Sequence, residues 1–132
     1  MNTQDINTRL AEFMEFIFIP NNGEDYSSGA STIGSWRTLK GERIEESSWR
    51  PSDDEYNFAY YQIHLCEMKL KEMGKNKAGI SYYSTYVHTL DGIVMRDYEE
   101  AGGENAGLLW FAQRTALPSQ RARAIINVLE GE

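Results

Sequence analysis

The pattern of hydrophobic and polar positions predicts one helix and two strands in the first third of the chain. Four apolar residues recur at the spacing of a single helix face, namely Ile6, Leu10, Phe13 and Met14. They indicate an amphipathic helix over about residues 4–15. Residues 16–19 form an apolar, β-branched and aromatic run that predicts a strand. We expect a polar loop over residues 21–34 and a second strand in 34–40 that pairs with the first.

The clearest helix signal lies in the middle of the chain, behind a polar, acidic loop expected over residues 41–52. Ser52 and Glu55 match the ends of a capping box, in which each side chain accepts from a backbone amide of the other residue. One apolar stripe then runs through Tyr56, Ala59, Tyr60, Ile63, Cys66, Leu70 and Met73. Gly74 provides a residue that can take a left-handed conformation and end the helix.

The second half of the chain alternates in a way that is typical of strands. Residues 79–89 have period-two character, and Asp91-Gly92 signals a tight turn before a returning strand at 93–95. Residues 97–107 are acidic and rich in glycine, which favours a loop, and residues 108–112 could form a last strand. Pro118 suits the first turn of a closing helix whose apolar face would be Ala122, Ile125, Ile126 and Leu129.

These elements follow the order α-β-β-α-β-β-α, which predicts an α+β fold. A mainly antiparallel sheet would carry helices on one or both faces. The length of 132 residues suits a single domain over 1–132, because a chain of this size can bury one core unaided.

The cysteine content and the apolar runs indicate in which cellular compartment the protein works. Cys66 is the only cysteine, so no internal disulfide forms, and one thiol fits a reducing compartment. The longest apolar run covers residues 16–19, far below the ~20 residues of a membrane span, and no signal-peptide pattern opens the chain. We therefore expect a cytoplasmic protein with no membrane contact.

The net charge limits the classes of molecule that the protein is expected to bind. Twenty acidic against thirteen basic residues give a net charge of −7, which disfavours direct binding to nucleic acid. Residues 1–66 carry most of this charge, with eleven acids and five bases. The densest acidic stretch is 42–55, which is either a solvated face or a surface that engages a basic groove.

Catalytic and metal-binding patterns are weak. His64 and His88 are the only histidines, and they lack the spacing of a zinc site, so we predict neither metal nor cofactor. Asp97, Glu99 and Glu100 cluster without a sign of the contrasting environments that acid–base catalysis needs. We therefore expect a noncatalytic protein.

Aromatic and arginine residues give two further observations. The aromatic residues placed on predicted strands or loops are Tyr26, Trp36, Trp49, Tyr82, Tyr83 and Tyr86. Such side chains are enriched at binding hot spots, although they could equally cap the core. Arg114, Arg121 and Arg123 form the one basic cluster, which could hold an anion or pair with nearby acids.

Three segments, Asp5–Met14, Ser48–Asp53 and Leu117–Ile126, resemble the phage ABA-sandwich domain family, which includes the NinX-like small phage proteins. The resemblance covers about a third of the chain, and none of the segments is a catalytic signature. It implies an α/β/α sandwich that is encoded by a phage and works in the host cytoplasm. It carries no established activity or catalytic residue.

Two functional hypotheses remain at this point. The first is a phage accessory protein that binds and inhibits a host protein, such as a defence protein with a basic nucleic-acid-binding groove, through an acidic surface. That surface would comprise Trp36, Glu42, Glu45, Glu46, Trp49 and Asp53. The alternative is a nucleotide-sequestering domain that binds its ligand with Tyr82, Tyr86, Arg121 and Arg123. Pairing of two copies is also plausible.

Overall fold

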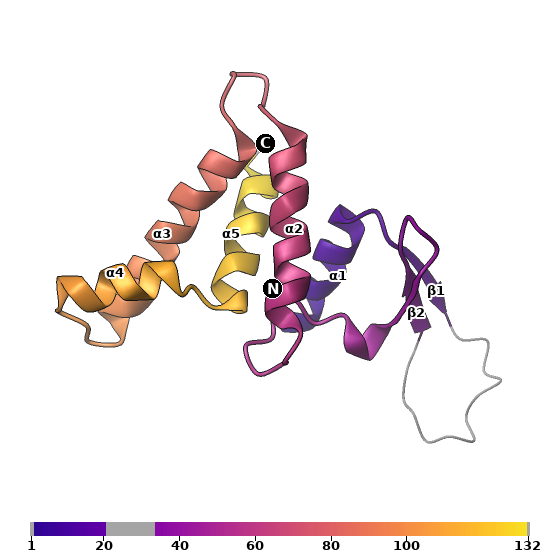
Figure 1. Ribbon diagram of the computed structural model, residues 1–132, viewed down its shortest axis with the longest axis horizontal. Coiled ribbons are helices and arrows are strands. Elements are labelled where there is room, and N and C mark those ends of the chain that lie inside the picture. Colours follow the sequence, from indigo (N-terminus) through magenta and orange to yellow (C-terminus); the bar gives the residue numbers. More distant parts are fainter. Residues whose placement is uncertain (1, 21–33, 132) are drawn as a thin grey trace.

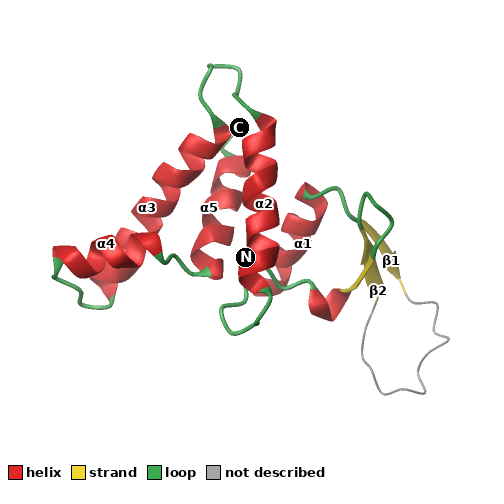
Figure 2. Ribbon diagram, viewed as in Figure 1, coloured by secondary structure: helices red, strands yellow, loops and turns green. Residues whose placement is uncertain are grey.

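A computed structural model describes residues 2–20 and 34–131, with the backbone alone at positions 106, 107, 110 and 111. The fold is of the α+β class (Figure 2). Its elements are α1 (Thr3–Phe13), β1 (Ile17–Pro20), β2 (Gly34–Arg37), β3 (Arg43–Glu45), the 3-10 helix η2 (Glu46–Ser48), α2 (Ala59–Met73), α3 (Tyr82–Glu100), α4 (Ala106–Arg114) and α5 (Pro118–Glu130).

Helix α5 lies at the centre of the helical part, where it contacts α1, α2 and α3. Figure 1 shows α5 between α2 and α3, with α4 beyond α3 at one end and the sheet beside α1 at the other. The predicted closing helix is confirmed, and Ala122, Ile125 and Ile126 of its expected apolar face are buried. These small and branched side chains allow the neighbouring helices to pack closely around α5.

The first helix and the first strand pair are also confirmed. Asn2 begins α1 by accepting a hydrogen bond from the Asp5 amide at 2.8 Å, and Leu10 and Phe13 face the core. β1 pairs antiparallel with β2, so that Phe18 lies opposite Trp36. β3 adds to the other side of β2 and completes a three-stranded antiparallel sheet. The loop predicted over residues 21–34 lies outside the described residues, apart from Gly34.

The strands predicted in the second half of the chain are wrong. Residues 82–100 form the long helix α3, which includes the expected Asp91-Gly92 turn, and residues 106–114 form α4 rather than a strand. Ser81 begins α3 by accepting from the Ser84 amide at 3.2 Å. Tyr86, Leu90 and Val94 are buried at helical spacing and pack on the rest of the core, which outweighs the local preference for a strand. The described residues therefore do not follow the α-β-β-α-β-β-α order.

The acidic segment before α2 is more structured than predicted. It contains β3 and η2, and α2 begins at Ala59, so Ser52 does not cap this helix. Asp54 instead accepts hydrogen bonds at 2.8 Å from the Ser119 amide and from the Ser119 hydroxyl. A carboxylate at the start of α5 also faces the positive end of that helix dipole. The apolar stripe of α2 is confirmed at Ile63, Cys66 and Leu70, but Tyr60 and Met73 are exposed and Tyr56 precedes the helix. Gly74 ends the helix with a φ of 75°.

Within residues 2–20 and 34–131, no helix combines the length and the apolar character needed to cross a bilayer.

Candidate functional site

A groove with a volume of about 550 Å³ opens between α1, the sheet and η2. It is lined by Thr8, Glu12, Phe16, Phe18, Trp36 and Glu46. Two of these six side chains are carboxylates, three are aromatic, and none is basic. An aromatic concavity with a few polar groups is the usual form of a recognition site.

Helix α1 forms one wall of the groove with the side that faces away from the core. Gln4, Thr8 and Glu12 follow one another at four-residue spacing, which places them on the same side of the helix. The opposite side of α1 carries Leu10 and Phe13 into the core. The amphipathic pattern that fixes α1 on the core therefore also turns Thr8 and Glu12 towards the sheet.

The aromatic residues form the rest of the lining. Phe18 meets Trp36 edge to face, with ring centroids 5.1 Å apart, across the β1–β2 pair. Trp36 is only 6% exposed, so it belongs to the core while it lines the groove. Phe16, just before β1, packs on the Trp49 ring at 4.9 Å. These contacts hold the rings in fixed orientations before any ligand arrives.

Glu46 is the unusual residue of the groove. Its Oε1 accepts a hydrogen bond from Gln4 Nε2 at 3.1 Å. Its Oε2 is buried and has no hydrogen-bond donor within the part of the chain that the structure describes. A buried carboxylate oxygen without a donor is energetically unfavourable, and its burial keeps this atom out of contact with a ligand in the groove.

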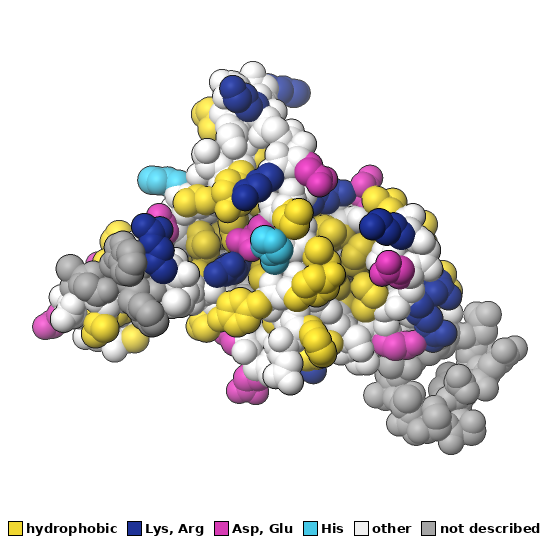
Figure 3. Space-filling view, viewed as in Figure 1, with side chains coloured by type: hydrophobic (Ala, Val, Ile, Leu, Met, Phe, Trp, Pro, Cys, Tyr) yellow, Lys and Arg dark blue, Asp and Glu magenta, His cyan; other side chains and the backbone are white. Residues whose placement is uncertain are grey.

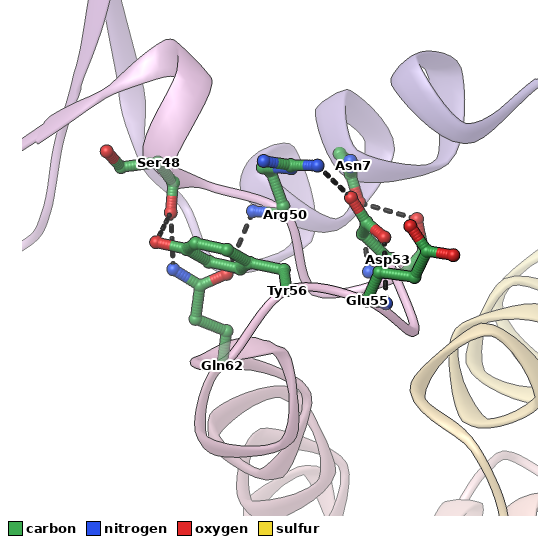
Figure 4. A network of polar contacts seen from close by, with 8 residues as sticks. Asn7, Ser48, Arg50, Asp53, Glu55, Tyr56 and Gln62 are labelled. Atoms are coloured by element: carbon green, nitrogen blue, oxygen red, sulfur yellow. Dashed lines mark hydrogen bonds and ion pairs between the residues drawn. The ribbon is translucent and has the colours of Figure 1, made fainter.

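The segment after η2 is fixed to α1 through Asn7 (Figure 4). The Asn7 side-chain oxygen accepts from the Ser52 hydroxyl at 2.6 Å and from the Ser52 amide at 3.1 Å. The Asn7 carbonyl accepts from the Trp49 indole N–H at 2.8 Å. Because Trp49 is only 2% exposed, it is a structural anchor and lies in the core, away from the predicted partner surface.

The same segment is fixed to α2 through Gln62 (Figure 4). Gln62 Nε2 donates to the Ser48 carbonyl at 2.6 Å, and its Oε1 accepts from the Arg50 amide at 2.8 Å. Arg50 forms an ion pair with Asp53. The Glu55 amide donates to Asp53 at 3.0 Å and, with Arg50, holds the pKa of that carboxyl below its ordinary value. Asp53 therefore has local partners already.

The predicted acidic surface is thus only partly assembled. Glu46 and Trp36 line the groove, and Glu42 is exposed at the turn between β2 and β3. Glu45 is half-buried and pairs with Arg43 at 2.8 Å. The described structure places Trp49 and Asp53 in the anchoring network instead. Sequence reasoning missed Thr8, Glu12, Phe16 and Phe18. Their signals were the four-residue spacing on α1 and the alternation at 16 and 18.

Three of the four residues of the alternative site are engaged elsewhere, and the fourth, Tyr82, is half-buried at the start of α3. The Tyr86 hydroxyl donates to Glu67 Oε2 at 2.5 Å, and Arg121 donates to Glu67 Oε1 at 3.3 Å. Tyr86 is 1% exposed, and burial followed by the hydrogen bond to Glu67 raises the pKa of its hydroxyl. Arg123 pairs with Asp97 at 2.5 Å. Both arginines are therefore neutralised by carboxylates, and this arrangement does not present a basic site for a phosphate.

Glu67 itself was not predicted as an important residue. It lies on α2 at helical spacing from Ile63 and Leu70, so an acid on the apolar stripe was the signal for a buried ion pair. His64 Nδ1 lies 3.7 Å from Glu67 Oε1 and is largely exposed. With Tyr86 and Arg121, Glu67 joins α2, α3 and α5 in what we interpret as a structural cluster.

Within the described part of the chain, neither the cysteine nor the histidines belong to a cluster of metal-binding side chains. Cys66 is fully buried, as expected for a structural thiol, and burial raises its pKa. Across residues 2–20 and 34–131, no three His, Cys, Asp or Glu side chains gather in a way that could hold a metal ion.

Exposed hydrophobic side chains follow α2. Phe58, Tyr61 and Met68 are 62%, 64% and 46% exposed. Figure 3 shows hydrophobic side chains gathered over this helix, with acidic and basic side chains among them. Nothing in the structure identifies what would cover this face, so pairing of two copies stays a prediction.

Comparisons with protein-family models, with curated proteins and with solved structures gave no match for this chain. The interpretation of the groove therefore depends on its own geometry and chemistry.

Proposed function

We propose that this chain is a noncatalytic binding protein that holds a basic partner protein in the groove between α1 and the sheet. The observation that carries this proposal is the lining of the groove, in which Glu12 and Glu46 accompany three aromatic residues without a basic side chain. Opposite charge steers the encounter of two proteins, and buried aromatic side chains supply much of the affinity.

The acidic first half of the chain supports the same interpretation. Residues 1–66 carry a net charge of −6, and they include the six described residues that line the groove. A partner with a basic surface, such as a groove that binds nucleic acid, would be attracted to this half of the protein. Inhibition of a host protein by a phage accessory factor remains part of this proposal, supported by the resemblance described above.

The test uses a partner captured from bacterial lysate, purified and then measured by titration at two salt concentrations. Glu12→Gln combined with Glu46→Gln removes the groove charges, whereas Glu99→Gln with Glu100→Gln removes two exposed charges on α3. The proposal predicts that binding weakens with salt, is lost in the groove variant and is retained in the α3 variant. Unchanged binding of the groove variant would overturn the assignment of the partner to this surface.

A further inference from the structure

We propose that two copies of this chain associate through β1, whose exposed edge pairs antiparallel with β1 of the second copy and joins the two sheets into one. The pairing uses the backbone of β1 rather than the groove, so it does not depend on the proposed function. Three features support it, namely the exposure of β1, its lack of charged side chains and the symmetry of its sequence.

β1 is an edge strand that lacks the charged side chains that usually protect an edge. Within the described residues it pairs with β2 alone, and all four of its residues are exposed. Ile17, Phe18 and Ile19 are 67%, 36% and 42% exposed. An edge strand presents backbone N–H and C=O groups without partners, to which another strand can bind. The opposite edge is protected, because β3 carries Arg43 and Glu45. β1 is therefore the edge that can accept a further strand.

The neighbouring residues limit the segment that can pair. Pro20 ends β1 and has no N–H group to donate. At the other end, the Phe16 amide already donates to the Ala11 carbonyl at 3.0 Å. The segment that remains for pairing is 17–19, and its centre is Phe18.

This segment is complementary to itself, because it reads the same in both directions. A two-fold axis at its centre places Phe18 opposite Phe18 of the second copy, and it places Ile17 opposite Ile19. A two-fold dimer requires a surface of this kind, in which the same patch serves both copies. Aromatic and β-branched residues that lie opposite each other stabilise antiparallel strands. The symmetry of the segment therefore favours a second copy as the occupant of this edge.

The register of the sheet supports the same pairing. Phe18 lies opposite Trp36 across β1 and β2, and Trp36 lies opposite Ile44 across β2 and β3. These three residues form one row across the sheet. Pairing at Phe18 continues this row into the corresponding row of the second copy, which joins the two into a longer apolar row.

The charge distribution also favours association at the sheet. Each copy has a net charge of −7, so two copies repel each other where acidic residues dominate. β1 has no charged residue, and residues 34–45 contain three basic and two acidic residues. The described sheet therefore has no excess of negative charge. Because only three residues of each copy pair, the contact is smaller than a standard interface, and we expect a dimer that dissociates on dilution.

Analytical ultracentrifugation of the full chain tests the association. We expect the average mass to rise towards twice the chain mass as the concentration increases to about 1 mM. Ile19→Lys puts a charge on the paired edge and should raise the dissociation constant by about tenfold, because the substitution acts twice in a symmetric pair. Leu39→Lys adds the same charge at a 74% exposed position between β2 and β3 and should leave the constant unchanged. Circular dichroism checks that both variants keep their helix content. A monomer at every concentration, or equal effects of the two variants, would overturn the proposal.

Disulfide cross-linking tests the register of the pair. Ile17→Cys mixed with Ile19→Cys should cross-link on oxidation, because residues that lie opposite each other have Cβ atoms about 4.5–5.5 Å apart. Each variant alone should cross-link poorly, because its two cysteines would be diagonal neighbours about 7–8 Å apart. The native Cys66 is buried and does not compete. Failure of the mixture to cross-link, or equally fast cross-linking of either variant alone, would overturn this pairing.

Discussion

Replacing Gly92 by alanine distinguishes helix α3 from the turn that the sequence pattern favoured. Gly92 lies inside α3, and an added Cβ would meet no atom within 4 Å. Alanine is about 0.8–1.0 kcal/mol more favourable than glycine in a helix interior, so the variant is expected to be more stable by about that amount. With an unfolding entropy of roughly 0.28 kcal/mol per degree for a chain of this length, Tm should rise by about 3 °C.

The matched control is Gly74→Ala. Gly74 ends α2 with a φ of 75° and a ψ of −123°, a backbone conformation that alanine adopts only with strain. The expected loss is about 1–3 kcal/mol, opposite in sign to the effect at Gly92.

Urea unfolding followed by circular dichroism measures both variants, and thermal unfolding supplies Tm. If residues 91 and 92 formed a tight turn, alanine at position 92 would be strained. A stability loss above about 0.5 kcal/mol for Gly92→Ala would therefore refute the helix at this point.

Three further experiments test the core and its ion pairs. Tyr86→Phe leaves Glu67 Oε2 without its donor, so urea unfolding should show a free energy of unfolding lower by about 1.5–3 kcal/mol. Tyr83→Phe, at a half-buried position, should change it by less than about 0.5 kcal/mol, and equal effects of the two variants would contradict the hydrogen bond. Burial raises the pKa of Asp97, but the hydrogen bonds from Arg123 and Gln120 outweigh it and set the pKa below the ordinary 3.8. The stabilisation by Asp97 is therefore present above about pH 4 and lost as the pH falls below 3.8. The difference in free energy of unfolding between the wild type and Asp97→Asn should therefore disappear in acid. A difference that stays constant with pH would contradict this account. Finally, the buried Cys66 thiol should react with a disulfide reagent only after unfolding, and rapid reaction of the native protein would show that the thiol is accessible.

The elements that the sequence predicted well are those whose local and tertiary preferences agree. α1 and α5 each have an apolar stripe that matches their buried face, and Phe18 and Trp36 lie on a strand pair rich in strand-forming residues. The α2 stripe matches at Ile63, Cys66 and Leu70, whereas Tyr60 and Met73 are exposed. In α3 the two preferences conflict. Residues 79–89 were predicted as a strand from their period-two character, yet Tyr86 and Leu90 also stand four apart, and packing of the core favours this helical period. Such a conflict is resolved by packing against α5, which the local pattern does not contain.

The candidate site was only partly predictable for a related reason. Glu46 and Trp36 were identified from charge and residue type. The same reasoning also selected Trp49, which is buried against Asn7. The groove is formed by α1 and η2, which stand more than thirty residues apart in the chain. Only the tertiary arrangement shows that Glu12 and Glu46 share one groove, because neither local spacing nor composition predicts that two residues so far apart in the sequence lie close together in space.

NMR chemical-shift mapping with the captured partner is the most direct test of the groove. With the partner bound to the full chain, the account predicts that the ring resonances of Phe18 and Trp36 shift. Under the same conditions, the combined Glu12→Gln and Glu46→Gln variant should lose these shifts, and the combined Glu99→Gln and Glu100→Gln variant should keep them. Shifts confined to side chains outside the groove at saturating partner would contradict the central claim that this acidic, aromatic groove receives a basic partner.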